Sequence, residues 1–436
     1  MDDTPMLARF HVLERTAPTR PAIGDVEGAV AAELDLLRLD RSRLEGRSIA
    51  VAVGSRGIAS LREVVRAACR WLARQGANPF VFPAMGSHGG ATDAGQRQIV
   101  AEYGVTPDFV GAEVRSSMAA VEIGATPEGF PIFMDRHASE SDGVLVINRV
   151  KPHTGFSGRV ESGLAKMMAV GMGKERGARQ FHRLACRHGY EPVIRAVAGA
   201  VLSTGRILAG LALAENSRHE LAAIRGARPE SVVAVEEETL ALVKSLQPRI
   251  PFSNLELLVV DEIGKNISGS GMDTKVIGRG IPCAPGEAPA IRLIYARDLT
   301  EESGGNGLGA GLADIIHERL YRKIDFAKMH VNGRTSLHPS VAGVPMWFGA
   351  DREALEFGLR VLGSPDPGQQ RVVWIRNTLC LERILVSEAL ASESERIEGW
   401  RLSRGSHEVE YDDRENLAVP IPQIGAVDSG EARRSE

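Results

Sequence analysis

The sequence predicts an α/β protein with two domains, each built on a mostly parallel, Rossmann-like sheet flanked by helices. Apolar runs typical of buried strands recur along the chain, and most of them end in glycine or in a polar cluster. Segments with apolar residues at helical spacing lie between these runs, and such an alternation indicates parallel β-α-β units. The same order starts again after about residue 250, so two domains are expected.

The first domain is expected to span residues 1–250. Its strands are predicted within residues 48–57, 79–90, 143–155 and 207–217. Residues 60–76, SLREVVRAACRWLARQG, place apolar side chains at helical spacing and close on Gly76, as an amphipathic helix does. This order of strand, loop, helix and strand is typical of a parallel sheet covered on both faces.

The second domain is expected over residues 251–420. Pro248, Pro251 and Ser253 interrupt the chain before a new apolar run begins. Further strands are predicted within residues 255–273, 291–299 and 372–378, with a helix over 307–321. The polar residues 421–436 are expected to form a frayed tail.

Composition limits the classes of function. The 436 residues carry 52 Lys and Arg against 56 Asp and Glu, a formal net charge of −4, which argues against a nucleic-acid binder or an acidic-membrane binder. No run of eighteen apolar residues occurs, and the first residues carry acids instead of an apolar signal segment, so a cytoplasmic protein is expected. The cysteines have no paired spacing and indicate neither a disulfide framework nor a zinc knuckle: Cys69, Cys186, Cys283 and Cys380.

Reactive side chains gather in the loops that follow predicted strands. Arg56, His88, His153 and Lys265 all occupy such loops. Ligands of open parallel sheets bind beyond the carboxyl ends of the strands, so these side chains are expected to face one crevice, an active-site cleft between the domains.

The histidines are the first candidates for chemistry. His88 lies in GSHGGAT and His153 in VKPHTG, both loops with glycine, and imidazole titrates near neutral pH. Acid/base catalysis and an ordinary surface or core role both remain open for the pair. His182 lies in a predicted helix over 175–189, where a metal ligand and a capping group are the alternatives.

Three further features suggest anion binding. Residues 155–158, Gly-Phe-Ser-Gly, could present backbone N–H groups and the Ser157 hydroxyl to a phosphate at a helix N-terminus, or could be only a tight turn. Arg56 in GSRG has the fork geometry that suits a carboxylate or phosphate. The loop DEIGKNISGSGMDTK is rich in donors or is simply solvated. Residues 168–174 do not complete a P-loop, and residues 305–310 fit the dinucleotide pattern G-x-G-x-x-A but do not directly follow a strand.

Taken together, GSRG, GSHGGAT, KPHTGFSG and the stretch from Lys166 to His182 resemble the nickel-pincer lactate racemase family, which isomerises 2-hydroxy acids at C2. The resemblance covers about residues 48 to 185. It implies a nickel-pincer nucleotide, pyridinium-3-thioamide-5-thiocarboxylic acid mononucleotide, tethered to a lysine, with a histidine as the fourth nickel ligand. His182 would be that ligand and Lys166 the tether, since 182 − 166 = 16 residues agrees with the family, with Lys174 as the second candidate.

The same resemblance assigns roles to the remaining motifs. His88 and His153 become an acid/base pair that serves the two enantiomers, and Arg56 holds the substrate carboxylate. The turn formed by Gly155, Phe156, Ser157 and Gly158 becomes the seat of the cofactor phosphate. Dedicated cofactor-biosynthesis proteins are implied as partners, and an oligomer is compatible with the sequence.

Two departures from the family bear on the substrate. Val53 stands where the lactate-acting members carry an aspartate, and Gly271 and Met272 precede Lys275 where a tyrosine and a glutamine are expected. A 2-hydroxy acid larger or more polar than lactate, such as a sugar acid or a dicarboxylate, is therefore predicted. Its contacts would be the donors Lys265, Asn266, Ser268 and Lys275.

Two other functions remain open from the residues alone. His88, His153 and Asp93 could surround a zinc ion in a metal-assisted hydrolase or lyase. A non-catalytic protein that binds a nucleotide-like ligand is the third hypothesis.

Overall fold

The computed structural model describes residues 9–54, 57–247, 249–280, 289–336, 339–363 and 367–418. The chain divides into two compact units. The six-stranded unit comprises Thr19–His153 and Ser157–Gln247, and the eight-stranded unit comprises Met1–Pro18, Thr154–Phe156 and Pro248–Glu436. The chain therefore passes from one unit to the other at residues 247–248, next to the predicted boundary at 250, and three more times elsewhere.

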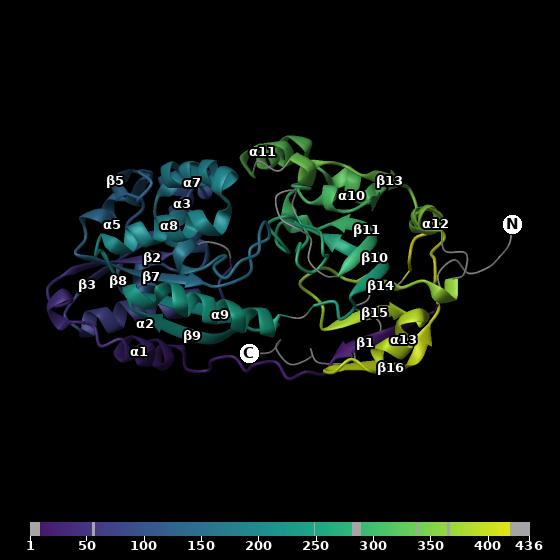
Figure 1. Cartoon of the computed structure of the whole chain (residues 1–436), viewed down its shortest axis with the longest axis horizontal. Helices are drawn as coiled ribbons and strands as arrows, with labels where there is room; N and C mark the ends of the chain where they lie inside the picture. Colours follow the sequence, from purple (N-terminus) through teal and green to yellow (C-terminus); the bar gives the residue numbers. More distant parts are fainter. Residues whose placement is uncertain are drawn as a thin grey trace. The chain divides into compact units, whose positions relative to one another are not determined.

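The six-stranded unit is built on a sheet with the strand order β4-β3-β2-β7-β8-β9 (Figure 1). All neighbours are parallel except β8 and β9, which are antiparallel. The strands are β2 Ser48–Val53, β3 Asn78–Pro83, β4 Glu113–Val114, β7 Gly143–Arg149, β8 Ile207–Glu215 and β9 Leu221–Ala227. A separate antiparallel pair is formed by β5 Ala120–Ala125 and β6 Pro131–Asp135.

Helices cover both faces of this sheet. They are α1 Val26–Leu36, α2 Leu61–Arg74, α3 Asp93–Glu102, α4 Pro107–Val110, α5 Arg136–Glu140, α6 Leu164–Lys166, α7 Lys174–His188, α8 Tyr190–Ser203 and α9 Val232–Leu246. In Figure 1, α1 and α2 lie below the labelled strands β2 and β7, and α5 and α7 lie above them.

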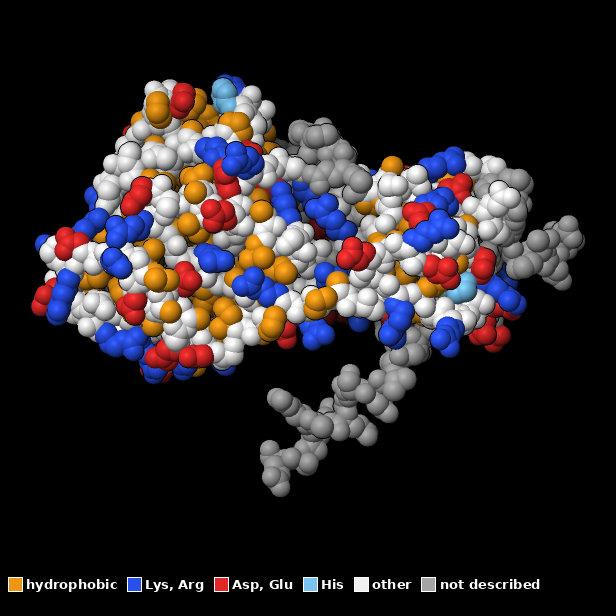
Figure 2. Space-filling model, turned by 60° about the horizontal axis from the view of Figure 1, so that its bottom comes forward, with side chains coloured by type: hydrophobic (Ala, Val, Ile, Leu, Met, Phe, Trp, Pro, Cys, Tyr) orange, Lys and Arg blue, Asp and Glu red, His pale blue; other side chains and the backbone are white. Residues whose placement is uncertain are grey.

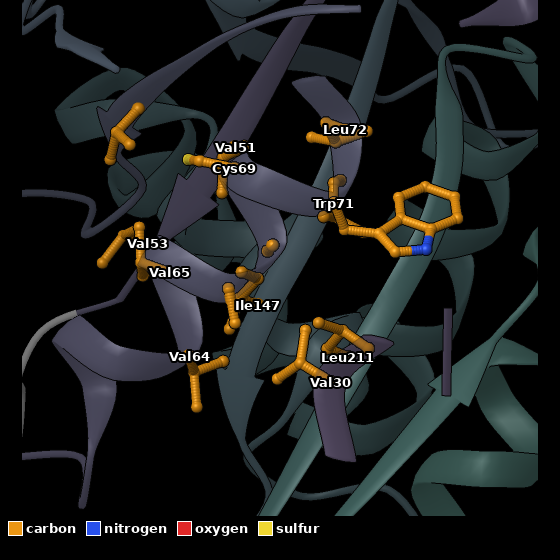
Figure 3. Close-up of a cluster of buried hydrophobic side chains, with 14 of the residues drawn as sticks. Val30, Val51, Val53, Val64, Val65, Cys69, Trp71, Leu72, Ile147 and Leu211 are labelled. Atoms are coloured by element: carbon orange, nitrogen blue, oxygen red, sulfur yellow. The ribbon is translucent and has the colours of Figure 1, made fainter. Parts of the chain in front are cut away.

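Burial on both faces explains the strand sequences. Val51 and Val53 of β2 join Val64 and Val65 of α2 in one hydrophobic cluster (Figure 3). On the opposite face α6 packs closely against β8. A Cβ at Gly210 of β8 would lie 2.7 Å from Cδ1 of Leu164 in α6. The predicted helix over 60–76 and the four predicted strands of this domain are thus confirmed.

The eight-stranded unit has the strand order β13-β12-β11-β10-β14-β15-β1-β16. The first five are parallel, and β15, β1 and β16 continue the sheet in antiparallel pairs. The strands are β10 Asn254–Ile263, β11 Ala290–Leu299, β12 Ile315–His317, β13 Met346–Phe348, β14 Val372–Ile375, β15 Arg383–Ser387, β1 Phe10–Arg15 and β16 Trp400–His407. The helices are α10 Glu318–Lys323, α11 Phe326–Ser336, α12 Asp351–Leu362 and α13 Glu388–Ser394.

Two features of this unit differ from the sequence predictions. The helix predicted over 307–321 is wrong, because Ile315 and Ile316 form the short strand β12 between β11 and β13, and a helix begins only at Glu318. β1, which was placed in the first domain, pairs with β15 and β16 instead. The predicted tail over 421–436 lies outside the described residues.

Acidic and basic side chains are interspersed on the face shown in Figure 2. Such a mixed surface agrees with the nearly balanced charge of the chain, 52 basic against 56 acidic residues. Among the helices that the structure describes, none combines the length and the apolar character needed to cross a membrane.

Candidate functional site

The strand order of the six-stranded unit creates a topological switch point. From β2 the chain continues through β3 to β4 on one side, and later returns to β7 and β8 on the other side. Adjacent strands whose connections leave in opposite directions mark the crevice where open parallel sheets bind ligands. His88 follows β3 and His153 follows β7, the two strands that flank β2, so both loops emerge from the same edge of the sheet.

The switch point itself is tightly packed around Asn148 and Met167. Gly54 directly follows β2, and a Cβ there would lie 2.8 Å from Asn148 Oδ1 and 3.0 Å from Met167 Cε. The Asn148 amide donates to the Gly163 carbonyl at 2.7 Å. The helical segment that carries Lys166 is thereby fixed to the carboxyl ends of β2 and β7.

Lys166 occupies an unusual stretch of backbone. It ends the short helix α6, and the chain continues directly into a π-helix, Met167–Gly171, before α7 begins at Lys174. π-helical turns are rare and occur frequently at functional sites. The Lys166 side chain is half-buried.

A buried carboxylate supports the start of this stretch. Glu236 of α9 is 0% exposed and accepts the backbone N–H groups of Leu164 and Ala165, the latter at 2.7 Å. Burial raises the pKa of Glu236 to about 7, although these two N–H groups act in the opposite direction. Its Oε1 atom has no hydrogen-bond partner among the described residues.

Aromatic contacts connect His153 with His182. The His153 ring lies 5.9 Å from the Tyr190 ring, Tyr190 lies 6.1 Å from Phe181, and the Phe181 ring meets His182 edge-on at 5.4 Å. Phe181 is buried, whereas both histidines are half-buried. The structure thus brings these two predicted residues into one aromatic cluster.

The loop that begins at His153 is held by carboxylates. The His153 backbone N–H donates to Glu161 Oε2 at 2.6 Å, and the Gly158 N–H donates to Glu161 Oε1 at 3.1 Å. Lys244 Nζ lies 2.6 Å from Glu161 Oε1 and balances its buried charge. Backbone hydrogen bonds between Lys151 and Ser162, at 2.8 and 3.2 Å, close the base of the loop.

The expected phosphate seat at a helix N-terminus is not formed by residues 155–158. The next helix, α6, begins only at Leu164, and Glu161 already accepts the Gly158 N–H. A Cβ at Gly158 would lie 2.1 Å from Glu191 Oε2, and Gly158 stays a predicted cofactor contact. Gly155, Phe156 and Ser157 remain predicted cofactor contacts, and Thr154–Phe156 group with the eight-stranded unit, where Thr274 Oγ1 donates to the Thr154 carbonyl at 2.6 Å.

The donor set fits a cofactor that brings its own metal ligands. One amine, Lys166, and one imidazole, His182, lie on successive helical segments of one unit. Among the residues that the structure describes, no group of three or more His, Cys, Asp or Glu side chains is arranged to hold a metal ion. His88, His153 and Asp93 therefore do not converge as the three-ligand zinc site of the hydrolase hypothesis.

The first part of the chain matches the model of a known protein family. Residues 14–191 match the family model described as the lactate racemase N-terminal domain. This part of the chain is therefore similar to the N-terminal domain of lactate racemases. The resemblance deduced from the motifs is confirmed at this level, and His88, His153, Lys166 and His182 all lie within the matched residues.

Solved structures that are similar to this chain include two of low sequence identity. The lactate racemase apoprotein from Thermoanaerobacterium thermosaccharolyticum is 14% identical, with a TM-score of 0.45 over 85% of this chain and 89% of its own. A protein from Thermotoga maritima is 13% identical, with a TM-score of 0.47 over 73% and 80%. No curated protein is a significant match to the sequence.

Within this lactate racemase domain, the two candidate lysines differ sharply. Lys174 is 0% exposed, and its ammonium contacts Asp135 Oδ2 at 3.1 Å, Gln96 Oε1 at 3.0 Å and the Pro83 carbonyl at 2.5 Å. The ammonium thus has two hydrogen-bond acceptors and one carboxylate at ion-pair distance. Lys174 is therefore poorly suited to tether a cofactor, and the half-buried Lys166 is the better candidate.

Val53 and Arg56 are the two residues of the six-stranded unit that the sequence linked to the substrate. Val53 is 0% exposed and packs in the core of the domain, so this departure from the family gives no information about the substrate. Arg56 lies outside the described residues. Its described neighbours are fixed, because the Ala59 N–H donates to Glu215 Oε1 at 2.8 Å and Arg149 Nη1 donates to the Gly57 carbonyl at 3.4 Å.

The donors predicted in the eight-stranded unit make several internal hydrogen bonds. Lys265 Nζ donates to the Gly269 carbonyl at 2.5 Å and to Asn332 Oδ1 at 2.9 Å, and Asn266 Oδ1 accepts from Thr300 at 2.7 Å. Ser268 is buried beside Ser270, and the Lys275 N–H donates to Asp273 at 2.8 Å. These contacts shape the loop itself, and substrate binding by these residues stays a prediction.

The buried polar residues that support the site were not among the residues predicted from the sequence. Gln96 and Glu236 occupy inward-facing positions of α3 and α9, next to Val100 and Leu240 in the helical repeat. A polar residue at an apolar position of an amphipathic helix is the signal that could have identified both. Glu161 lies in a loop without such a repeat, and only the structure shows its role.

Proposed function

We propose that this protein is a racemase or epimerase that inverts C2 of a 2-hydroxy acid, with a nickel-pincer nucleotide as its cofactor. The observation that carries the proposal is that the matched lactate racemase domain contains His88, His153, Lys166 and His182, with His153 and His182 in one aromatic cluster. The match to the lactate racemase N-terminal domain supports an isomerase, and the residues at the switch point are chemically suited to one.

The cofactor would be held by two residues of the six-stranded unit. Lys166 would form the covalent tether, and the His182 imidazole would complete the nickel coordination, a ligand type that suits nickel. When bound, the cofactor supplies the hydride acceptor for C2, chemistry that no protein side chain provides.

The chain's own residues would handle the proton and the orientation of the substrate. One imidazole, of His88 or His153, would take the proton from the C2 hydroxyl as the hydrogen leaves C2 as hydride. The other would give a proton to the carbonyl oxygen of the 2-keto acid when the hydride returns to the opposite face of C2. A positioned general base contributes roughly 10²- to 10⁴-fold in rate. Arg56 would hold the carboxylate with two parallel hydrogen bonds and so fix the plane of the keto acid.

The substrate is proposed to be a 2-hydroxy acid larger or more polar than lactate. Lys265, Asn266, Ser268 and Lys275 supply the donors that suggest this class. A panel of sugar acids, hydroxy dicarboxylates and lactate, each as a single stereoisomer, is the appropriate set of substrates.

The test is isomerisation in deuterated water by nickel-loaded, cofactor-bearing protein. Inversion at C2 without incorporation of deuterium is expected, because the hydrogen that leaves C2 as hydride returns to the same carbon. Incorporation of deuterium at C2 would contradict the proposal and favour simple proton abstraction. Hydrolysis or elimination products would favour the lyase or hydrolase alternative.

A further inference from the structure

A buried polar network lies next to the loop that carries His88. Lys174, Asp135 and Gln96 are each 0% exposed, although a lysine and an aspartate are almost never fully buried unless they are paired. Asp135 Oδ2 lies 3.1 Å from Lys174 Nζ, and Gln96 Oε1 accepts from the same ammonium at 3.0 Å. Replacing such a pair with apolar residues is often neutral or stabilising, so stability alone explains it poorly.

Gln96 connects this network to the His88 loop. Its amide nitrogen donates to the Gly86 carbonyl at 2.8 Å and to the His88 carbonyl at 3.3 Å. Because the Lys174 ammonium requires an acceptor, it fixes which end of the Gln96 amide carries the oxygen. Both N–H groups of Gln96 are therefore directed at the loop.

The same network fixes the start of α7, the helix that carries His182. Lys174 is the first residue of α7 and has a φ of 52°, a conformation that is costly for a residue with a Cβ. The Gly86 N–H donates to the Gly171 carbonyl at 3.0 Å, which joins the loop to the π-helix before α7. The strained residue and the loop thus belong to one hydrogen-bonded assembly.

We infer that Lys174 and Gln96 are positioning residues, which hold the His88 loop in a fixed place relative to the π-helix and α7. This inference rests on the proposed function for its catalytic consequence. The structural statement concerns only residues of the six-stranded unit, so it can be tested on cofactor-free protein.

The decisive variant is Gln96→Glu in the full chain. The carboxylate keeps the size of the side chain and the contact with Lys174, but it removes both donors to the loop. Gln98→Glu is the matched control, because Gln98 lies on the same helix α3 with its side chain exposed and its amide on Glu102. Gln96→Met serves as a second variant of similar size without a buried charge.

The primary readout is hydrogen exchange of backbone amides in cofactor-free protein. Exchange at Gly86 and His88 is expected to accelerate about ten-fold in Gln96→Glu and Gln96→Met relative to Gln98→Glu, as the loss of buried hydrogen bonds implies. Exchange in β2 and β7 should stay unchanged. Unchanged exchange at Gly86 and His88, or equal acceleration throughout the unit, would overturn the inference.

The second readout is steady-state turnover of loaded enzyme. kcat should fall roughly ten-fold while KM matches that of the Gln98→Glu control. A kcat equal to that of the control would overturn the positioning role. If wild-type protein isomerises no 2-hydroxy acid, the proposed function fails and the exchange result alone decides the inference.

Discussion

Glu236 is a carboxylic acid whose protonation should affect the stability of the unit that holds Lys166. Burial raises its pKa from 4.5 to about 7, so the folded protein holds this proton more tightly than the unfolded chain does. The contribution of Glu236 to stability is therefore complete below pH 4.5 and is lost as the pH rises through 7. Its two backbone partners, the N–H groups of Leu164 and Ala165, begin the segment with Lys166.

The variant Glu236→Gln should remove this pH dependence. A glutamine oxygen can still accept the two N–H groups without carrying a charge, so the variant is expected to match wild type near pH 5. At pH 8 it should be more stable by on the order of 2 kcal/mol. Urea unfolding at both pH values measures the difference, and Glu238→Gln, exposed on the same helix, is the control. An equal change at both pH values would show that burial of the charge is not the cause.

Each of the two candidate catalytic histidines, His88 and His153, should be required for isomerisation in both directions. His88→Asn and His153→Asn are each expected to lower kcat/KM about 10²- to 10⁴-fold, because each removes one general acid/base. For a pair of enantiomers the equilibrium constant is one, so kcat/KM must fall equally in both directions. His219→Asn is the control, since His219 is exposed and its φ of 59° suits asparagine. Turnover that survives in either variant would remove that histidine from the mechanism.

The sequence identifies the candidate reactive residues more readily than the buried polar residues that hydrogen-bond to their loops and helices. His88, His153 and His182 stand in loops or on a helix with recognisable motifs, whereas Gln96, Glu161 and Glu236 act through burial and through the carbonyl or N–H groups that they reach. Burial of a polar group depends on tertiary packing, which a single sequence does not encode locally. The same limit left Lys174 as a second candidate beside Lys166, because the sequence does not show that Lys174 is fully buried.

At the scale of elements, the π-helix and the loop after β3 fit each other without space for a side chain. A Cβ at Gly171 would lie 2.3 Å from the Ala84 carbonyl oxygen, and this carbonyl belongs to backbone that cannot rotate away. The Gly171 carbonyl in turn accepts the Gly86 N–H at 3.0 Å. The close approach of these two segments therefore depends on glycine.

Gly171→Ala should destabilise the protein by about 1–3 kcal/mol, as overpacking does in a rigid site. The matched control is Gly199→Ala on α8, where a Cβ meets nothing within 4 Å and should stabilise the helix by up to about 1 kcal/mol. Thermal unfolding of both variants measures the contrast. A Gly171→Ala protein as stable as wild type would show that the two segments are not closely packed.

Elements with long and regular patterns were predicted correctly, whereas the three-residue strand β12 was not. The strands β2, β3, β7 and β8 have continuous apolar runs because both of their faces are covered. β12 has three residues, and its assignment depends on pairing with β11 and β13. Whether so short a segment forms a strand depends on the strands beside it in space. Without that information, the apolar spacing around Ile315 indicates a helix.

At the scale of the whole molecule, the chain does not follow the simple order of two successive domains. β1 lies between β15 and β16 in the eight-stranded sheet. Almost 240 residues of chain separate it from β10, the next strand of this sheet along the sequence. Phe10, Val12 and Leu13 of β1 are buried in that unit. The first strand is therefore a structural part of the last domain, a pairing that no local sequence pattern reveals.

Removal of residues 1–18 should unfold part of the eight-stranded unit and leave the six-stranded unit folded. β16 would lose the strand with which it pairs, and loss of three buried apolar side chains costs on the order of 5 kcal/mol. Limited proteolysis should then cleave within residues 383–407 first. Removal of residues 1–8, which leaves β1 intact, is the control, and equal resistance of the two truncated proteins would contradict this role of β1.

The central claim is that Lys166 and His182 hold a nickel-pincer nucleotide in this lactate racemase homologue. Peptide mass spectrometry of cofactor-loaded protein that isomerises a 2-hydroxy acid tests it most directly. The account predicts the mass of the cofactor on the peptide with Lys166, an unmodified Lys174, and loss of the adduct but not of the fold in Lys166→Arg. An active protein with an unmodified Lys166, or with the adduct on Lys174, would contradict it.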